Sequence, residues 1–355
     1  GKMPLSCVNF ITMNVLLNPS DHAIIISCGT CLKTLHKLGI KPDFHCEQER
    51  TFPVAEKVTH YCPAEFLEGI VLLGPTIVHP EVFNLFSRRI MAAKMNEPSS
   101  ALLQRDAEGG ELFSSYHFIN PTVANTALVM GYNLGFKNFF LCGIDLGHKQ
   151  GDLHHSKKSL YYNDQEEDQN LYQVNAAKQI EVDGNFGGKF QCDSFFYQSN
   201  ASLSKQIIGF SDLNCFNLSD GALVKGSIST RPNDLVSMFE DKKVLQKSSL
   251  VTQVYEGSIH LDNELSLYKR LVANLDYELF DWICAKLISV NDKPLASFQD
   301  AANLLLLNTD LIRNTNQHIN DLLIGTVMHI QVALTQLLYG SASEEDGLCR
   351  FQQGL

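Results

Sequence analysis

The sequence has little positive charge and no long apolar run. It contains 28 Lys and Arg residues against 39 Asp and Glu residues, and the net charge of -11 argues against a general nucleic-acid surface. A local basic pocket for phosphate is compatible with this balance. No run approaches about 18 uninterrupted apolar residues, and the start, GKMPLSCVNF, lacks the charged and apolar regions of a signal peptide. These absences give no support to a membrane span or to secretion, so we expect a cytoplasmic protein.

The ten cysteines show no regular spacing that would indicate a disulfide framework. Cys28 and Cys31 form only a CGTC segment, and in a chain of 355 residues the pattern predicts reduced core thiols rather than a zinc site. A histidine pair that includes His148 gives no compact ligand set on a helix, so we expect no structural metal. The 45 % of hydrophobic residues are enough for a substantial core.

Short apolar segments alternate with helical segments up to about residue 230. Residues 22–27 (HAIIIS) and 44–46 (FHC) are buried-strand candidates, and a helix is expected between them at 31–38. Since strands that alternate with helices pair in parallel, the pattern predicts an α/β fold with a Rossmann-like, mostly parallel sheet. Residues 164–168 (DQEED) and the glycine-rich turn 183–188 are expected to form a solvated insertion.

The pattern changes beyond Pro232 to long segments with helical periodicity. These segments span roughly residues 261–289 and 297–338, and their apolar residues have core spacing. We therefore expect a Rossmann-like domain at 1–235 and an all-helical C-terminal domain at 236–355.

The stretch 116–162 carries the strongest signs of a site. Its first part, 122–134, has helical spacing, and Asn120 and Pro121 suit an N-cap and a first helical position. A buried strand is expected next at 139–142.

Asp145 follows this expected strand directly, in the segment Gly143-Ile-Asp145. In open α/β sheets ligands bind outside the carboxyl ends of the strands, so Gly143, Asp145 and the polar tail 148–162 lie where a substrate would be held. A cap for the following turn is the alternative role for Asp145, and its place in GIDLG favours the ligand role.

Three histidines and two tyrosines crowd the polar tail. His154 and His155 are either ordinary loop histidines or groups for proton transfer near neutral pH, and their adjacency allows at most one to point inward. Tyr161 and Tyr162 either pack on the surface or donate a hydrogen bond to a departing phosphate.

Two further groups of candidates follow a strand or open a helix. The side chains of Glu47 and Glu49 alternate in direction if the strand persists, so one faces solvent while the other meets a sugar hydroxyl. Asn120, Thr122 and Asn125 either cap the helix or bind an anion at its N-terminus, and the helix dipole favours the second role.

Three segments carry a family resemblance: AIIISCGTCLKTLHKLGIKPDFHCEQE, INPTVANTALVMGYNLGFKNFFLCGIDLGHKQGDLHH, and VDGNFGGKF together with SDLNCFNLSDGALVKGS. They resemble the Maf (motility-associated factor) flagellin glycosyltransferases, and their central domain resembles the MptE-type hydroxymethylpterin diphosphokinases. The resemblance covers about residues 15 to 230. The strand end GID, followed by tyrosines, is also similar to bacterial CMP-sialic-acid sialyltransferases, which implies a sialyltransferase-like sheet and a nucleotide-sugar donor.

The chain departs from the family pattern at two places. The family opens with a strand and a GxGPSL turn that holds phosphate, and no such motif precedes His22, which leaves open that the first strand is missing. Relatives have G-S-V where this chain has NPTV, so Pro121 lacks one phosphate-contacting N–H, and the hydroxyl of Thr122 is a candidate replacement. The histidine base of the sialyltransferases does not transfer, because Tyr197 and its neighbours stand at that place.

The resemblance implies inverting transfer of a nonulosonic acid, of the pseudaminic, legionaminic or sialic type, from a CMP donor to Ser or Thr of flagellin. The implied catalytic residues are Asp145, His155 and Glu47. The implied donor-binding residues are Gly29, Thr30, Asn120, Thr122, Asn125, Gly143, Tyr161 and Tyr162. No cofactor is implied with certainty, and Mg²⁺ is left open.

Two other functions are compatible with the sequence. The MptE-type reaction, diphosphate transfer from ATP to a pterin alcohol, needs magnesium, with Asp145 and Glu47 or Glu49 as the available ligands. A non-catalytic module that binds flagellin or assists its assembly is favoured if the glycine-rich turn is truly absent.

Overall fold

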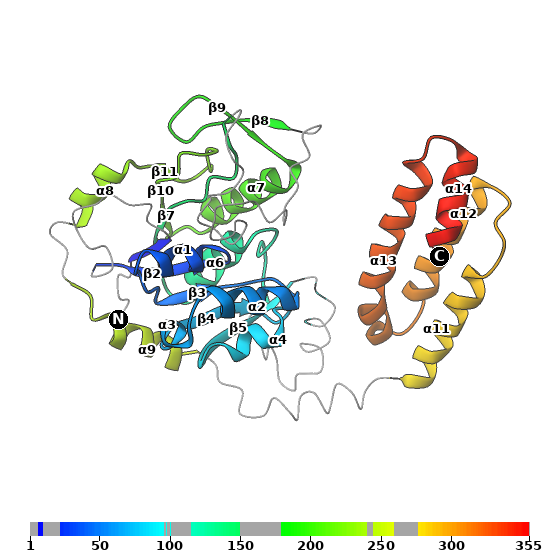
Figure 1. Ribbon diagram of the computed structural model, residues 1–355, viewed down its shortest axis with the longest axis horizontal. Coiled ribbons are helices and arrows are strands. Elements are labelled where there is room, and N and C mark those ends of the chain that lie inside the picture. The colour runs from blue at the N-terminus through cyan, green and yellow to red at the C-terminus, as the bar shows by residue number, and fades with distance from the viewer. Residues whose placement is uncertain are drawn as a thin grey trace. The chain divides into compact units, whose positions relative to one another are not determined.

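The computed structural model describes residues 6–9, 22–95, 97, 100, 115–149, 179–239, 244–258 and 276–354. The described residues fall into two compact units (Figure 1). The α/β unit holds those up to residue 95 and those between 115 and 258, and the helical unit holds residues 97, 100 and 276–354.

Nine strands of the described chain form one sheet in the order β11-β10-β7-β1-β2-β3-β4-β5-β6. Each of their pairings is parallel. The strands are β1 (Ser6–Asn9), β2 (Ile24–Cys28), β3 (Phe44–Cys46), β4 (Val71–Pro75), β5 (Arg88–Lys94), β6 (Ser115–Tyr116), β7 (Asn138–Leu141), β10 (Asn214–Asn217) and β11 (Ile228–Ser229). The predicted Rossmann-like parallel sheet is therefore confirmed.

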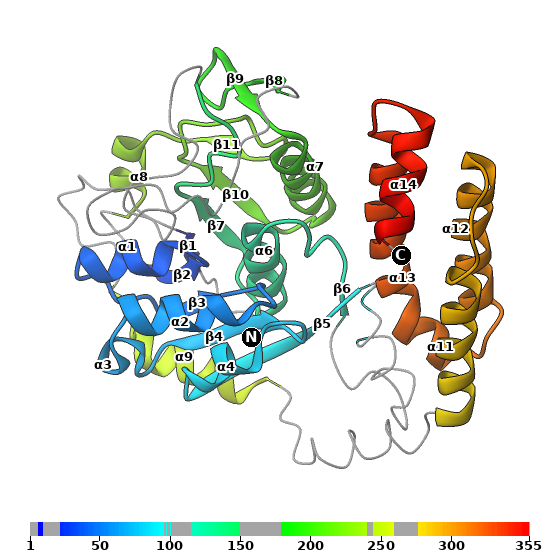
Figure 2. The ribbon, with the colours of Figure 1, turned by 45° about the vertical axis from the view of Figure 1, so that its right-hand side comes forward.

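The sheet is covered by helices on both faces, as a fully parallel sheet requires. Ile24 and Ile26 belong to one core cluster with residues of α6 and α7, whereas Ile25, between them, belongs to another cluster with Leu35 of α1. The helices of this unit are α1 (Cys31–Lys37), α2 (Phe52–Tyr61), α3 (Ala64–Leu67), α4 (Pro80–Asn84), α6 (Val123–Asn133), α7 (Ser194–Gly209), α8 (Pro232–Phe239) and α9 (Lys247–Glu256). Figure 2 shows α6 and α7 together beside the strands.

The first strand of the sheet is present, although its expected glycine motif is not found in the sequence. β1 pairs with β2 on one side and with β7 on the other. The strands that follow β1 extend the sheet in one direction as far as β6, and β7, β10 and β11 extend it in the other. The strand order thus reverses next to β1, which is where ligands bind in open α/β sheets.

The α/β unit includes α9 and so extends beyond residue 235, where the sequence suggested a boundary. Lys247 Nζ lies 2.6 Å from Asp43 Oδ2, and Val251 belongs to the core cluster that contains α6. Arg88, the first residue of β5, donates a hydrogen bond of 3.3 Å to the Thr252 hydroxyl. The expected boundary rested on the change in periodicity near Pro232, and these contacts of α9 join residues far apart in the sequence.

A small antiparallel hairpin stands apart from the large sheet. It consists of β8 (Ile180–Asp183) and β9 (Lys189–Cys192), joined by the turn 184–188. The prediction of a solvated insertion is wrong for this turn, because Asn185 is buried and bonded to the strand ends of the sheet. Residues 164–168 lie outside the described residues.

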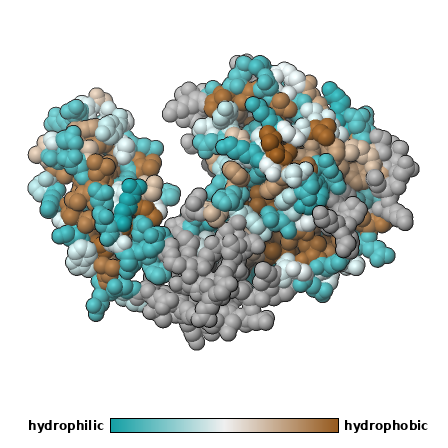
Figure 3. All heavy atoms as spheres, turned by 180° about the vertical axis from the view of Figure 1, so that it is seen from behind, coloured by the Kyte–Doolittle hydropathy of each residue, from teal (hydrophilic) through white to brown (hydrophobic). Residues whose placement is uncertain are grey.

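The helical unit confirms the predicted all-helical C-terminal region. Its helices are α11 (Tyr277–Asn291), α12 (Phe298–Arg313), α13 (Gln317–Tyr339) and α14 (Glu344–Gly354). Asp276, Ser297 and Asn316 cap the first three by accepting a hydrogen bond from the third backbone N–H that follows. The unit also exposes large apolar side chains, and Figure 3 shows such residues on its surface. Among the described residues, α13 is long and apolar enough to cross a membrane. Length and composition alone are weak evidence for a span, because core helices of soluble proteins can share them.

Candidate functional site

The carboxyl edge of the sheet carries two groups of the predicted site residues, separated by β1. The first group follows β2 and β3 and includes Gly29 and Glu47. The Gly29 N–H donates a hydrogen bond of 2.9 Å to the carbonyl oxygen of Cys46, which holds the turn after β2 against the end of β3. The second group, around Asp145, follows β7.

Glu47 is a buried carboxyl with two different oxygens. The residue is 3 % exposed, and Oε1 accepts hydrogen bonds from the backbone N–H groups of Gln48 at 2.8 Å and Glu49 at 3.1 Å. Oε2 accepts none from the described residues and lies 3.9 Å from the position that a Cβ atom would take at Gly29. One oxygen is therefore held in place while the other faces the turn after β2.

The environment of Glu47 raises its pKa to about 7. Burial is the main cause, since it disfavours the charged form, and the negative charge of Glu49 adds to it. The two backbone hydrogen bonds act in the opposite direction. A carboxyl with this pKa exists in both protonation states near neutral pH, which suits a general acid or base.

The start of α6 lies against this group. At Gly29, where φ is +47°, a Cβ atom would lie 3.4 Å from Val123 Cγ1. Gln48 donates a hydrogen bond of 2.6 Å from Nε2 to the carbonyl oxygen of Pro121, and its Oε1 accepts one of 2.5 Å from the Thr126 hydroxyl. The residue after Glu47 therefore fixes the position of the helix N-terminus.

The predicted N-cap is wrong by two residues. Thr122 is the N-cap and α6 begins at Val123, whereas Asn120 and Pro121 precede the helix and are joined by a cis peptide bond. Pro121 suggested a first helical position, but in this chain the proline stands before the cap.

Asn125 is fully buried and its amide is committed to the protein. Oδ1 accepts hydrogen bonds from the Thr122 N–H at 3.1 Å, the Thr122 hydroxyl at 2.7 Å and the Ser199 hydroxyl at 2.8 Å. Nδ2 donates one of 3.1 Å to the Ser199 carbonyl oxygen. Direct contact with a donor would require breaking this arrangement, so the structure gives Asn125 a capping role.

Thr30 is half-buried in the turn after β2, and Gly143 is exposed in the turn after β7. Thr30 precedes α1, and its hydroxyl makes no capping hydrogen bond. Gly143 follows β7 with φ +68°, a conformation that favours glycine, and nothing lies within 4 Å of a Cβ atom built there. The turn at Gly143 therefore has open space beside it.

Asp145 is held through its backbone and keeps an exposed surface. Its carbonyl oxygen accepts a hydrogen bond of 2.7 Å from the Ala222 N–H, and Gly221 packs so closely that a Cβ atom there would lie 2.2 Å from the same oxygen. Neighbouring protein groups displace water from the carboxyl and raise its pKa to about 6, and the negative charge of Asp220 adds to this effect.

Four predicted site residues lie outside the described residues. They are His154, His155, Tyr161 and Tyr162. Their roles stay predictions. In the part of the chain that the structure describes, no group of three or more His, Cys, Asp or Glu side chains has an arrangement that could hold a metal ion.

Several residues of the edge were missed by the sequence reasoning. Ser199 completes the hydrogen bonds of the α6 cap, Gln48 joins the cap to Glu47, and Asn185 braces the loop after β10. Nothing in the sequence indicated which distant loop Asn185 would contact.

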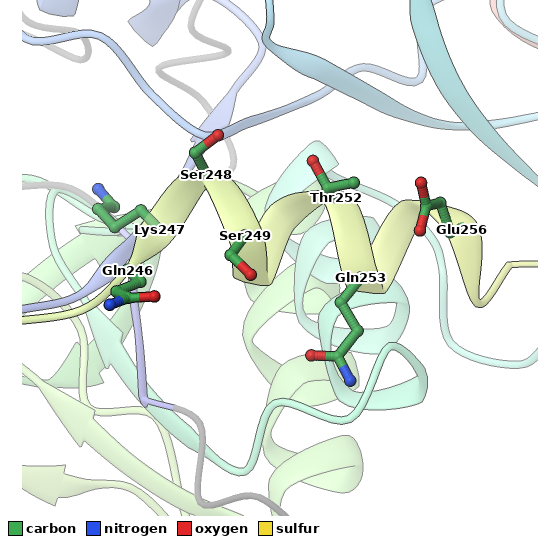
Figure 4. Close-up of a pocket in the computed structure, with 7 residues that line it drawn as sticks. All are labelled: Gln246, Lys247, Ser248, Ser249, Thr252, Gln253 and Glu256. Atoms are coloured by element: carbon green, nitrogen blue, oxygen red, sulfur yellow. The ribbon is translucent and has the colours of Figure 1, made fainter.

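A hollow elsewhere in the α/β unit does not belong to this edge. Figure 4 shows the residues that line it, which come from α9 and the residue before it: Gln246, Lys247, Ser248, Ser249, Thr252, Gln253 and Glu256. α9 bonds to Asp43, which precedes β3, and to Arg88, which begins β5. The hollow is therefore near the amino ends of the strands.

Comparison with known proteins supports the fold described above. A family model described as "6-hydroxymethylpterin diphosphokinase MptE-like" matches residues 12–151. The structure of the Maf glycosyltransferase from Magnetospirillum magneticum AMB-1 superposes with a TM-score of 0.64 at 20 % sequence identity. This chain has the fold of a Maf glycosyltransferase.

The predicted resemblance to the Maf and MptE-like proteins is thus confirmed. The match covers 100 % of this chain and 54 % of the Maf glycosyltransferase, so the chain spans about half the length of that protein. A comparison with curated proteins found no match.

Proposed function

We propose that this protein transfers a nonulosonic acid from a CMP donor to a Ser or Thr hydroxyl of flagellin. The likeness in fold to a Maf glycosyltransferase supports glycosyl transfer in general. The observation that carries the proposal is Glu47, a buried carboxyl with a pKa of about 7 at the carboxyl edge of the sheet.

Glu47 is the base in this proposal. Oε2 takes the proton of the acceptor hydroxyl as the hydroxyl oxygen bonds to the anomeric carbon, and the bond from that carbon to the phosphate oxygen breaks. CMP leaves with the electron pair of the broken bond. Because attack and departure take place on opposite sides of the anomeric carbon, the configuration is inverted.

The N-terminus of α6 is the proposed phosphate site. The first N–H groups of an α-helix have no partner within the helix, and the helix dipole favours an anion there. Thr122 and Gly29 lie at this end, and Thr30 follows directly after Gly29. Releasing CMP as an anion is easier where fixed dipoles are already oriented toward its phosphate.

Asp145 is proposed to orient a hydroxyl group of the donor. Its carboxyl stands at the end of β7, on the other side of β1 from Glu47. If Glu47 and Asp145 both contact the donor, it is held from opposite sides of β1. The anomeric carbon would then lie near Glu47, and the movement of the donor would be limited.

The MptE-type diphosphokinase reaction is the second candidate, because the family model that matches residues 12–151 carries that description. In that reaction ATP and Mg²⁺ replace the CMP donor, and either Glu47 or Asp145 would offer a carboxylate to the ion.

Calorimetry with CMP, and with ATP plus Mg²⁺, separates the two candidates. We expect CMP to bind and ATP to bind at least ten-fold more weakly, a difference of about 1.4 kcal/mol. Transfer from a CMP-nonulosonate to purified flagellin is the matching activity assay. Tight binding of ATP and Mg²⁺ without CMP binding would replace the glycosyl-transfer proposal with the diphosphokinase one.

A further inference from the structure

The β8–β9 hairpin contacts the loop after β10 through the buried side chain of Asn185 and through backbone pairing, in which the Leu223 N–H donates a hydrogen bond of 2.7 Å to the Asp183 carbonyl oxygen and Gly184 pairs with Ala222. Asn185 is 5 % exposed. Its Nδ2 donates hydrogen bonds to the carbonyl oxygens of Asn217 at 2.9 Å and Ser219 at 3.0 Å, and its backbone N–H donates one of 2.8 Å to Gly221. Its Oδ1 accepts a hydrogen bond of 2.8 Å from the Ser229 hydroxyl. Asn185 thus binds the loop from 217 to 221 at three of its backbone carbonyl oxygens.

The same loop holds the segment that carries Asp145. The Ser219 hydroxyl accepts a hydrogen bond of 2.9 Å from the Ile144 N–H, and the Ala222 N–H donates one of 2.7 Å to the Asp145 carbonyl oxygen. Gly221 lies against the backbone of Asp145 with no space for a Cβ atom between them. Any shift of the loop from 217 to 222 therefore moves Asp145.

We propose that Asn185 is a positioning residue, which acts through the loop 217–222 to hold the Asp145 carboxyl in the candidate site. The hairpin would then serve to fix this carboxyl. The proposal rests on the proposed function for what Asp145 does in transfer, whereas the position of the carboxyl is measured independently of any reaction.

The pKa of Asp145 depends on the groups that surround its carboxyl, so a change in the position of the carboxyl can be measured as a change in this pKa. Asp220 belongs to the bracing loop and raises the pKa of Asp145, and Lys149 Nζ lies 2.7 Å from Asp220 Oδ2. His148, on the same segment as Asp145, exchanges two backbone hydrogen bonds of 2.9 Å with Gln191 of β9. Since the displacement of water from the carboxyl by neighbouring protein groups is the main cause of the raised pKa, admitting water to the carboxyl lowers it.

The test is an NMR titration of the Asp145 carboxyl carbon, assigned with an Asp145→Asn variant. In the wild-type protein we expect a pKa of about 6. In Asn185→Ala we expect the pKa to fall by about one unit or more toward the ordinary value near 3.9, because the loop no longer holds the carboxyl in place.

Asn200→Ala is the matched control. Asn200 also donates from Nδ2 to a backbone carbonyl, that of Leu223, at 3.0 Å, but Leu223 lies just beyond the residues that contact Asp145. A merely structural role for Asn185 predicts that both variants melt at lower temperature and that the Asp145 titration stays as in the wild type. That result in a folded Asn185→Ala protein would overturn the proposal.

If Asn185→Ala does not fold, Ser219→Ala tests whether the loop 217–222 positions the Asp145 carboxyl. It removes the hydroxyl that accepts from the Ile144 N–H and leaves the backbone carbonyl to which Asn185 donates. We expect a fall in the pKa of Asp145 here too, and an unchanged titration would overturn the proposal.

The transfer assay separates this proposal from the proposed function. If both hold, kcat/KM for glycan transfer falls roughly ten-fold or more in Asn185→Ala, because a small displacement of a reacting group is costly. If the wild-type protein neither binds CMP nor transfers a sugar, the proposed function fails while the pKa shift in Asn185→Ala still supports the positioning role.

Discussion

The two halves of the carboxyl edge present their carboxyl groups in opposite ways. On the β2–β3 half, Glu47 is 3 % exposed and is fixed through its side chain by two backbone N–H groups. On the β7–β10 half, Asp145 is exposed and is fixed through its backbone by the loop after β10. Both carboxyl groups have raised pKa values, of about 7 for Glu47 and about 6 for Asp145, although the two residues are held in place in different ways.

This difference assigns different tasks to the two groups. A buried carboxyl with one fixed oxygen can exchange a proton with a substrate at neutral pH, since its charged form is disfavoured. Asp145 keeps an exposed surface and is held by its backbone, so its carboxyl is better suited to accept hydrogen bonds from a substrate that covers it. We therefore expect substitution of Glu47 to reduce the chemical step and substitution of Asp145 to affect substrate positioning.

Glu47→Gln should have the largest effect on activity. The amide keeps an oxygen that can accept from Gln48 and Glu49, so the fold is preserved, but it cannot take a proton. We expect kcat for transfer to flagellin to fall by about 10²- to 10⁴-fold, the usual contribution of a general base. The measurement is steady-state transfer, with circular dichroism to confirm folding.

Glu49→Gln is the control for this substitution. Glu49 is exposed, and its backbone N–H rather than its side chain contacts Glu47. We expect activity within about two-fold of wild type. Equal losses in the two variants would show that the charge of the segment matters rather than the buried carboxyl.

The same Glu47→Gln variant should change how stability depends on pH. The pKa of Glu47 is raised from 4.5 to about 7 in the folded protein. The stability that protonated Glu47 contributes to the folded protein is therefore fully present below pH 4.5, the pKa of the unfolded state. It is lost as the pH rises through about 7. Relative to wild type, the variant should gain up to about 3 kcal/mol of unfolding free energy between pH 4.5 and pH 8.

Chemical denaturation across this range provides the measurement. Burial lowers the pKa of His45 to about 3, so that group gives a slope of opposite sign, with stability lost as pH falls below about 6.5. His45 is present in both proteins and cancels in the difference. A difference between variant and wild type that is constant with pH would mean that Glu47 titrates normally.

Asp145→Asn tests the other half of the edge. If its negative charge orients a donor hydroxyl, kcat/KM should fall by about 10²-fold, or about 2.7 kcal/mol, with the melting temperature nearly unchanged. If Asp145 only caps its turn, asparagine should replace it with little effect on turnover. Activity within a few fold of wild type in a folded variant would assign Asp145 to the structural role.

The strand ends could be predicted from the sequence because they depend on local patterns. Short apolar runs followed by Gly29, Glu47 and Asp145 indicated parallel strands, and the order along the chain placed these residues at one edge. The environments of the two carboxyl groups could not be predicted in this way. They depend on contacts between residues far apart in the sequence, such as that of Gln48 with Pro121.

The helix start shows the limit most clearly. Pro121 is common at the first helical position, so local preference favoured a helix from that residue. The tertiary structure instead uses Thr122 as the cap, because its hydroxyl and Asn125 are completed by Ser199 of α7. The bracing role of Asn185 was equally hidden, since its partners follow it by more than 30 residues.

The smallest expected effects concern the hydroxyl groups at the start of α6. Ser199 and Thr122 each bond to Asn125 Oδ1, and their own oxygens are 2.8 Å apart. Ser199→Ala and Thr122→Val should therefore each cost about 1 kcal/mol of stability. Only Thr122 lies at the helix N-terminus, where a phosphate would bind, so Thr122→Val should also weaken CMP binding by about ten-fold.

Calorimetry with CMP compares the two variants directly. Ser199→Ala should bind CMP within about three-fold of wild type, because the hydrogen bonds from Thr122 to Asn125 remain and the cap keeps its position. Similar affinities in both variants would mean that the Thr122 hydroxyl serves the cap alone. The phosphate would then be held by the backbone N–H groups of α6 and by its dipole, which neither substitution removes.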